Sequence, residues 1–89
     1  MVYFLVMKKN RYVKVGSTDN RKRRKKEYET HNPAFKCVGI LPDATIEDEK
    51  VFQFLLEEMG FKKTSTEWFK VPKKFSMKKI IKKGFLIFE

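Results

Sequence analysis

The sequence predicts one small α/β domain, and three features lead to that fold class. Two runs of β-branched and aromatic residues lie close together near the N-terminus, as in a β-hairpin. A third apolar run follows at 36–41, and a segment with the apolar spacing of a helix follows at 46–59. A chain of 89 residues can support only one hydrophobic core, so we expect residues 1–89 to form a single domain.

The first predicted element is an antiparallel hairpin. Its strands are Val2–Met7 and Tyr12–Val15, and Lys9-Asn10 is a possible two-residue turn in which Asn10 tolerates a positive φ. In this register one face of the hairpin is wholly apolar and belongs in the core. That face carries Val2, Phe4, Val6, Val13 and Val15.

The opposite face of the hairpin is mixed in character. Tyr3 is expected to face Gly16 across the two strands, and Leu5 is expected to face Lys14. The face therefore brings a phenol, a lysine and a glycine together. Polar groups at such positions require a structural or functional reason.

A polar helix is predicted next, from 21 to about 31, after good N-cap residues at 18–20. Its only substantial apolar group is Tyr28, so it lacks the apolar stripe that normally fixes a surface helix to a core. Arg24, Tyr28 and His31 share one side of this helix. We expect His31 to be an ordinary helix-end residue.

The middle of the chain is predicted to hold a third strand from Lys36 to Leu41 and a second helix from about Ile46 to Met59. Gly60 ends that helix. The predicted core stripe of the helix consists of Val51, Phe52, Leu55 and Met59. Glu49 is expected on the flank of the stripe, beside Gln53 and Leu56.

The last third of the chain is less regular. Residues 67–71 are expected to form a short strand or a bound loop, in which Trp68-Phe69 closes the core over the second helix. Residues 73–83 read as a basic helix and residues 84–89 as a possible extra strand. The domain therefore divides into a core of about 1–72 and a basic C-terminal extension at 73–89.

Charge makes nucleic acid the first candidate partner. The chain holds 21 Lys and Arg against 11 Asp and Glu, a net charge of +10. Basic residues dominate 8–36 and 61–89, whereas 43–58 is acidic. A lysine-rich codon bias could explain the general excess, but it explains the basic run at 21–26 less well. That run could also be a nuclear localisation signal.

Other classes of protein are excluded by composition. A single Cys37 and a single His31 exclude a disulfide framework and a Cys/His zinc site, so a metal must be held by oxygen. No apolar run is long enough to span a membrane, and Val2–Met7 is too short for a signal peptide. We therefore expect an intracellular protein without membrane partners.

The ordered motifs resemble those of the GIY-YIG nuclease superfamily. They are Met1-Val2-Tyr3, Lys14-Val15-Gly16, Arg24 eight residues further on, Glu49 in the second helix, and Glu67-Trp68-Phe69. The resemblance is closest to the short phage and viral branch, in which the second motif often begins with Lys, and it covers residues 1 to about 72. It implies a small three-stranded antiparallel sheet flanked by helices. It also implies cleavage of phosphodiesters with one divalent metal. If the protein is viral, as this branch suggests, we expect it in the host cytoplasm or nucleus.

The resemblance assigns the catalytic roles. Glu49 matches the family glutamate and would hold Mg²⁺ or Mn²⁺, although acidic residues also favour the first turn of any helix. Arg24 matches the family arginine, which grips phosphate oxygens, with Arg23 as its competitor. Tyr3 matches the tyrosine that approaches the attacking water, and its alternative is a packed strand tyrosine.

Supporting roles are open in several cases. Lys14 could meet phosphate or merely neutralise its face, Tyr28 could support the site or pack in the core, and Gly16 could leave room for substrate or end its strand. A basic group on the first helix would grip backbone phosphates; it consists of Arg21, Lys22, Arg23, Lys25 and Lys26. We expect Tyr3, Lys14, Arg24 and Glu49 to converge on one concave face.

Some positions depart from the family pattern. Only the tyrosine of the first motif is kept, Ser17 stands where several relatives have a basic residue, and Gln53 stands where close relatives often have His. Loss of catalysis is therefore one alternative.

The sequence thus predicts a metal-dependent endonuclease that acts on DNA in preference to RNA. Selectivity would come from a structured substrate, a homodimer or a protein partner. The first alternative is an inactive nucleic-acid-binding module of the same fold. The second is a regulatory protein that binds an acidic partner through its basic tail and through Phe61, Phe75, Phe85 and Phe88.

Overall fold

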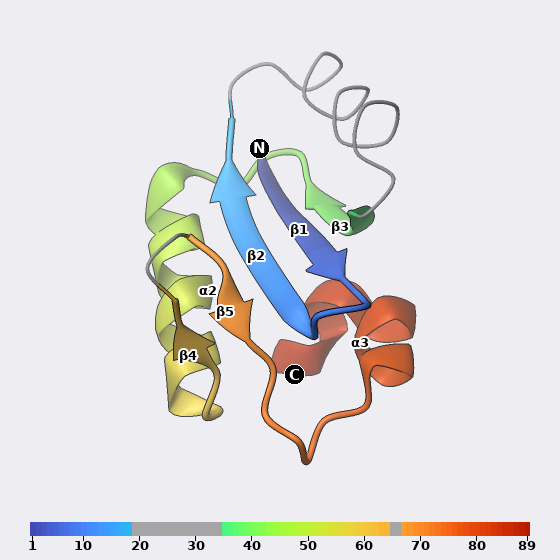
Figure 1. Cartoon of the computed structure of the whole chain (residues 1–89). Coiled ribbons are helices and arrows are strands. Elements are labelled where there is room, and N and C mark those ends of the chain that lie inside the picture. Colours follow the sequence, from blue (N-terminus) through green and yellow to red (C-terminus); the bar gives the residue numbers. More distant parts are fainter. Residues whose placement is uncertain (19–34, 65–66) are drawn as a thin grey trace.

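A computed structural model of the chain describes residues 1–18, 35–64 and 67–89, and Figure 1 shows their arrangement. The helix predicted at 21–31 lies outside these residues. The described elements, in chain order, are β1 (Val2–Met7), β2 (Tyr12–Ser17), β3 (Lys36–Leu41), α2 (Ile46–Glu58), β4 (Lys62–Lys63), β5 (Phe69–Lys70), α3 (Met77–Lys83) and the 3₁₀ helix η1 (Gly84–Phe88). Among them is no helix long and apolar enough to cross a membrane.

The strands form one antiparallel sheet in the order β3-β1-β2-β5-β4. The α/β class, the hairpin register and the third strand are confirmed, including the pairs Tyr3↔Gly16 and Leu5↔Lys14. The sheet has five strands, however, and not the expected three. Strand β5 falls within 67–71, where a short strand or a bound loop was expected, whereas β4 was not expected; each has two residues, which is too short for any alternation of apolar and polar residues to show in the sequence.

The turn of the hairpin differs from the expected two-residue turn. Residues 8–11 connect the strands, and the positive φ, 59°, belongs to Arg11 and not to Asn10. Long-range contacts stabilise this conformation. The Arg11 guanidinium donates to the carbonyl oxygens of Pro72 and Phe75, both at 2.8 Å, and the Arg11 carbonyl accepts from the Val71 amide at 2.9 Å.

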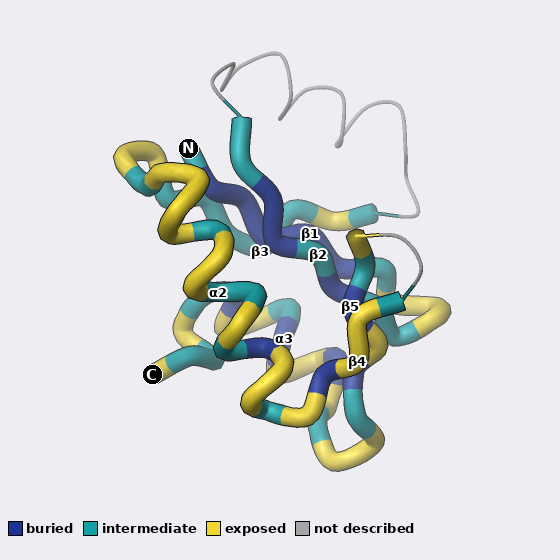
Figure 2. The backbone as a smooth tube through the Cα atoms, turned by 90° about the vertical axis from the view of Figure 1, so that its left-hand side faces the viewer, coloured by how far each residue is buried: buried dark blue, intermediate teal, exposed yellow. Residues whose placement is uncertain are grey.

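The hydrophobic core lies on one face of the sheet, beneath α2 and α3 (Figure 2). The apolar face predicted for the hairpin is fully buried there: Val2, Phe4, Val6, Val13 and Val15 are at most 1% exposed. The helices add Leu56, Met77 and Ile80 to the core, and the segment between them adds Phe61, Phe69 and Val71.

Helix α2 is rotated relative to the expected stripe. Leu56, placed on the flank by the sequence pattern, is fully buried, whereas Val51 is 55% exposed. Phe52 and Met59 pack against the core as expected. The pattern misled because α2 also carries the exposed Phe54, so apolar residues occur all round the helix and do not mark one stripe.

The C-terminal segment corrects two expectations. Residues 84–88 form η1 and not a strand, and α3 begins only at Met77. The reversal into η1 occurs at Gly84, which has a φ of 54° and lies so close to β3 that a Cβ would stand 2.5 Å from the Val38 carbonyl oxygen.

The phenylalanines assigned above to a possible acidic partner belong to the core. Phe61 is 2% exposed, and the other three, Phe75, Phe85 and Phe88, pack against the core cluster. The ring of Phe85 makes an edge contact with Phe4 at 5.4 Å between centroids. These rings therefore do not form an exposed binding surface.

Candidate active site at the free edge of β2

Tyr3 and Gly16 form the first part of the candidate site. A Cβ built on Gly16 would lie 2.5 Å from Cζ of Tyr3 and 2.8 Å from Cε2, so the hydroxyl end of the ring lies directly over Gly16. The space at Gly16 is therefore occupied by Tyr3 and is not left for substrate. The glycine lets the phenol extend from β1 across β2, toward the outer edge of β2.

That outer edge is open beyond β5. Strand β5 pairs with β2 only at Tyr12 and Val13. Because alternate residues of a strand direct their backbone polar groups to the same edge, the Val15 carbonyl points to the side of β5 but has no strand residue opposite it. The side-chain amide of Gln53 donates to this carbonyl oxygen at 3.1 Å. Helix α2 thus runs along the free edge of β2.

Glu49 lies on the same side of α2 as Gln53. It precedes Gln53 by one turn and the fully buried Leu56 by two turns, so its side chain projects from the sheet-facing side of the helix and is half-buried. No hydrogen bond or ion pair joins its carboxylate to another residue in the described part of the chain.

The two neighbouring acidic residues have different environments. Asp48 belongs to a capping box, in which its carboxylate accepts from the Thr45 amide at 2.7 Å and the Asp48 amide donates to the Thr45 hydroxyl. Glu47 is exposed. Capping therefore accounts for Asp48, whereas Glu49 is left to face the edge of the sheet.

Helix α2 does not lie over the Tyr3 face of the sheet. Helix α2 contributes Leu56 to the core cluster, which lies on the face opposite Tyr3. Tyr3 therefore lies on the face of the sheet opposite α2, whereas α2 carries Glu49 on the side of the helix from which Gln53 contacts the β2 edge. Their convergence at that edge stays a prediction.

Lys14 is engaged by an acidic residue of the predicted motif. Its Nζ lies 2.9 Å from the Glu67 carboxylate, and the lysine side chain is 18% exposed. The hydrogen bond from Lys14 and its charge hold the pKa of Glu67 below its ordinary value. Charge neutralisation within its own face is thus one function of Lys14. The signal for the pair is the glutamate that precedes Trp68-Phe69.

The residues of the Glu-Trp-Phe motif have separate roles. Phe69 is buried in the core as expected, with 1% exposure. Trp68 instead contacts Phe35, with 4.8 Å between ring centroids. Alternation along β5 explains the difference, because adjacent residues of a strand point to opposite faces.

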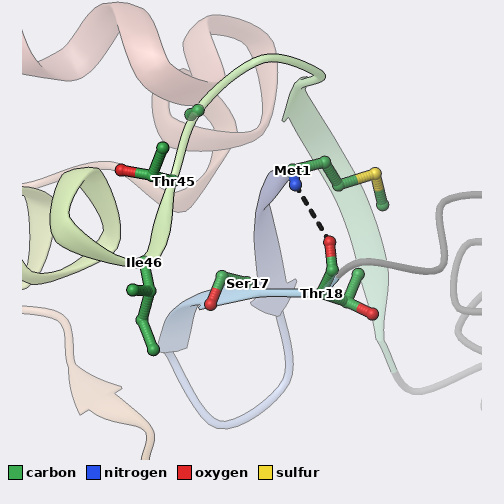
Figure 3. A pocket seen from close by; sticks show the side chains of 6 residues that line it. Met1, Ser17, Thr18, Thr45 and Ile46 are labelled. Carbon is green, nitrogen blue, oxygen red and sulfur yellow. Dashed lines mark hydrogen bonds between the residues drawn. The ribbon is translucent and has the colours of Figure 1, made fainter.

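A cavity of about 550 Å³ opens at the end of the sheet where β1 begins, β2 ends and α2 begins. Figure 3 shows Met1, Ser17, Thr18, Thr45 and Ile46 around it, with the Met1 amino group donating to the Thr18 carbonyl at 2.9 Å. Three hydroxyl side chains line the cavity. It lies directly after Gly16 along β2 and one turn before Glu49 along α2.

The residues at this edge fit a magnesium ion, with a single protein carboxylate. Mg²⁺ keeps several waters and is commonly bound through one or two carboxylates together with substrate phosphate. The described residues contain no group of three or more His, Cys, Asp or Glu that could form a complete protein cage. Glu49, half-buried and not engaged by another described residue, is the carboxylate that suits such an open site.

Several predicted residues fall in 19–34, outside the described residues. They are Arg21, Lys22, Arg23, Arg24, Lys25, Lys26, Tyr28 and His31. Gln53, in contrast, is a site residue that sequence reasoning treated only as a departure. Its spacing of four residues from Glu49 is the signal that could have identified it.

Comparison with known proteins identifies a family for this chain. The family model of the T5orf172 domain matches residues 1–84, and this domain is related to the GIY-YIG nucleases. Neither a curated protein nor a solved structure matches the chain.

Proposed function

Because the chain belongs to the T5orf172 domain family, which is related to the GIY-YIG nucleases, we propose that it is a divalent-metal-dependent endonuclease. Its substrate is the phosphodiester backbone of nucleic acid, DNA in preference to RNA. The observation that carries the proposal is the position of Glu49, which faces the β2 edge one turn from Gln53 and is not engaged by the helix cap.

Glu49 would hold the Mg²⁺ or Mn²⁺ ion at the β2 edge. A divalent cation at a phosphodiester neutralises charge on the phosphate oxygens and lowers the pKa of a water that attacks it. Gln53 fixes α2 against Val15 and so sets the distance of Glu49 from the sheet. An attacking water would be oriented by the Tyr3 hydroxyl, which lies over Gly16 of β2.

Basic residues would complete the site. Arg24 is proposed to hold two phosphate oxygens with its planar guanidinium as charge builds on them. The other basic residues of 21–26 would grip neighbouring phosphates. Lys14 would contribute positive charge from the Tyr3 face, reduced by its pairing with Glu67.

The test is cleavage of labelled single-stranded, duplex and branched DNA, with matched RNAs, in Mg²⁺ or Mn²⁺. Wild-type protein should cut, and Glu49→Gln should lower the rate by more than about 100-fold, because losing even an outer-shell partner of a metal costs 10- to 100-fold. Affinity for DNA should remain. Glu47→Gln, at an exposed position two residues before Glu49 on the opposite side of the helix, is the matched control and should cut normally.

Equal activity of Glu49→Gln and the Glu47→Gln control at saturating metal would place the metal elsewhere and defeat the assignment of Glu49. Cutting of RNA but not DNA would reverse the proposed substrate.

An inactive nucleic-acid-binding module is the second candidate. The observation that favours it is the ion pair of Lys14 with Glu67, which draws the lysine of the second motif away from substrate. DNA binding by the wild type without cleavage in either metal would select this candidate.

A further inference from the structure

The chain has a second basic surface, outside the candidate active site. Between Glu67 and Glu89 there are seven lysines and no acidic residue. Six of the lysines lie at 73–83, in α3 and the turn before it, and all six are exposed. None forms an ion pair with another described residue. The positive charge of this surface is therefore uncompensated locally.

Three of these lysines surround a cavity. A hollow of about 340 Å³ lies between α3 and η1, lined by Lys74, Lys79 and Lys83 together with Ser76. Ile80, which is fully buried, contributes to its floor. Lysine stems can lie along an apolar floor while their ammonium groups meet at the rim. Glu89 also lines the hollow, and three lysines outweigh its single charge.

Helix stability alone does not explain this arrangement. Lysines in the last turn, such as Lys82 and Lys83, favour a helix through its dipole. Lys79 and Lys83, however, are four residues apart, and like charges at this spacing cost a few tenths of a kcal/mol. Lys74 lies before the helix and has no dipole role. The rim thus concentrates positive charge beyond what the helix requires.

The basic surface lies far from the candidate active site along the sheet. Helix α3 lies near the turn that joins β1 to β2, whereas α2 begins near the opposite end of these strands (Figure 1). The molecule is 33 Å long along its longest axis. This length is an upper limit for the separation of the two sites, and each strand of duplex DNA carries a phosphate about every 3.4 Å of axis, so both sites could contact phosphates within about one turn of a duplex.

We propose that α3 and the turn before it bind the phosphate backbone of nucleic acid at this lysine rim, as a contact separate from the candidate active site. The choice of nucleic acid as the polyanion rests on the proposed function. An anionic membrane suits the surface poorly, because membrane-surface helices insert an apolar face, and the apolar residues Met77 and Ile80 of α3 are buried in the core.

The test measures the affinity of the full chain for a DNA duplex of about three turns, without divalent metal, over a series of salt concentrations. Lys79→Gln/Lys83→Gln should weaken binding and lower the slope of log affinity against log salt by about two units, because each lost phosphate contact removes about 0.9. Lys79→Arg/Lys83→Arg should keep the wild-type slope. The matched control, Lys62→Gln/Lys63→Gln on β4, removes the same charge from another exposed site.

The proposal is overturned if the glutamine pair and the β4 control lower the slope equally, since net charge would then explain both. It is also overturned if Lys79→Arg/Lys83→Arg lowers the salt slope as much as the glutamine pair does, or if wild-type protein binds phosphatidylserine vesicles and not DNA. The assay contains no metal, so its outcome is independent of cleavage. If the rim binds DNA but the protein does not cleave it, this inference holds and the nuclease proposal fails. If the protein cleaves DNA but Lys79→Gln/Lys83→Gln keeps the wild-type salt slope, the nuclease proposal holds and this inference fails.

Discussion

Helices α2 and α3 cover the same face of the sheet, and each is fixed by one fully buried aliphatic residue, Leu56 in α2 and Ile80 in α3. Their solvent sides are opposite in charge. Helix α2 has three acidic residues in its first turn and no basic residue in its last turn. Helix α3 has no acidic residue in its first turn and two lysines in its last.

The contrast teaches that packing and charge are separate requirements in this fold. Buried side chains fix where each helix lies, and the solvent side is then available for a ligand. On α2, acidic groups suit a cation at the β2 edge but repel phosphate along the outer surface. On α3, lysines attract phosphate. A polyanion would therefore be oriented on the protein before any specific contact forms.

The largest predicted effect tests whether burial fixes both helices equally. Leu56→Ala and Ile80→Ala should each lower the free energy of unfolding by about 2–5 kcal/mol, because both side chains are fully buried and leave cavities. Val51→Ala, at a position 55% exposed, is the control and should cost less than about 0.5 kcal/mol. Urea denaturation gives all three values. A small loss of stability for Leu56→Ala alone would mean that α2 is held mainly by the hydrogen bond of Gln53 to the edge of β2.

The glycines that follow the two helices allow a finer comparison. Gly60 after α2 and Gly84 after α3 both have positive φ, but a Cβ at Gly60 would meet only Pro72, at 3.8 Å, whereas a Cβ at Gly84 would overlap the Val38 carbonyl. Gly60→Ala should cost about 1–2 kcal/mol from backbone strain. Gly84→Ala should cost more than about 2 kcal/mol, from strain and overlap together. Equal melting temperatures for the two variants would contradict this difference.

A contact specific to α2 should have a smaller effect. Gln53→Ala removes the hydrogen bond to the Val15 carbonyl, which we expect to cost about 0.5–1.5 kcal/mol. The control is Phe54→Ala at the next position, whose side chain is exposed, and it should leave the free energy of unfolding nearly unchanged. If the bond positions Glu49, Gln53→Ala should also lower the cleavage rate at saturating substrate, under conditions in which the variant is fully folded. A wild-type cleavage rate in the folded Gln53→Ala variant would show that Gln53 has only a structural role.

The smallest effect concerns paired charge, in contrast to the unpaired lysines of α3. The pKa of Glu67 is lowered by Lys14, so the pair contributes to stability above the ordinary pKa of 4.5 and loses that contribution as pH falls below it. Glu67 is 73% exposed, so the contribution should stay below about 1 kcal/mol. Glu67→Gln should therefore flatten the pH dependence of unfolding between about pH 5 and 3. If unfolding of the Glu67→Gln variant depends on pH as steeply as that of the wild type, other carboxylates are responsible for the pH dependence.

Much of the fold could be predicted because its signals are local. Alternation in residues 2–15 was sufficient for the register of β1 and β2, and the apolar run at 36–41 for β3. A short strand or a bound loop was expected at 67–71, where β5 lies, but neither the pairing of β5 with β2 nor strand β4 could be predicted, since two residues carry no periodicity and the partners are distant in the chain. The 3₁₀ helix at 84–88 was missed because its apolar residues pack around the turn at Gly84, a tertiary effect.

The candidate site was predicted less completely. The sequence indicated that Tyr3 faces Gly16 but not that the ring covers the glycine, because that depends on a side-chain rotamer. It identified Glu49 through motif order, while the rotation of α2 that turns Glu49 to the sheet depends on Leu56 being buried. The pair Lys14–Glu67 joins residues that are distant in sequence, so spacing alone could not show it.

The Arg11 contacts have a consequence for the order in which the protein folds. The acceptors of its guanidinium lie 61 and 64 residues further along the chain. At a synthesis rate of about 5–20 residues per second, the hairpin therefore waits roughly 3–12 seconds for the segment that completes its turn. An isolated two-stranded hairpin is only marginally stable in water. We expect nascent chains that end before residue 72 to remain sensitive to proteases. The hairpin should become stable only after Pro72 and Phe75 have been synthesised and can accept the Arg11 hydrogen bonds.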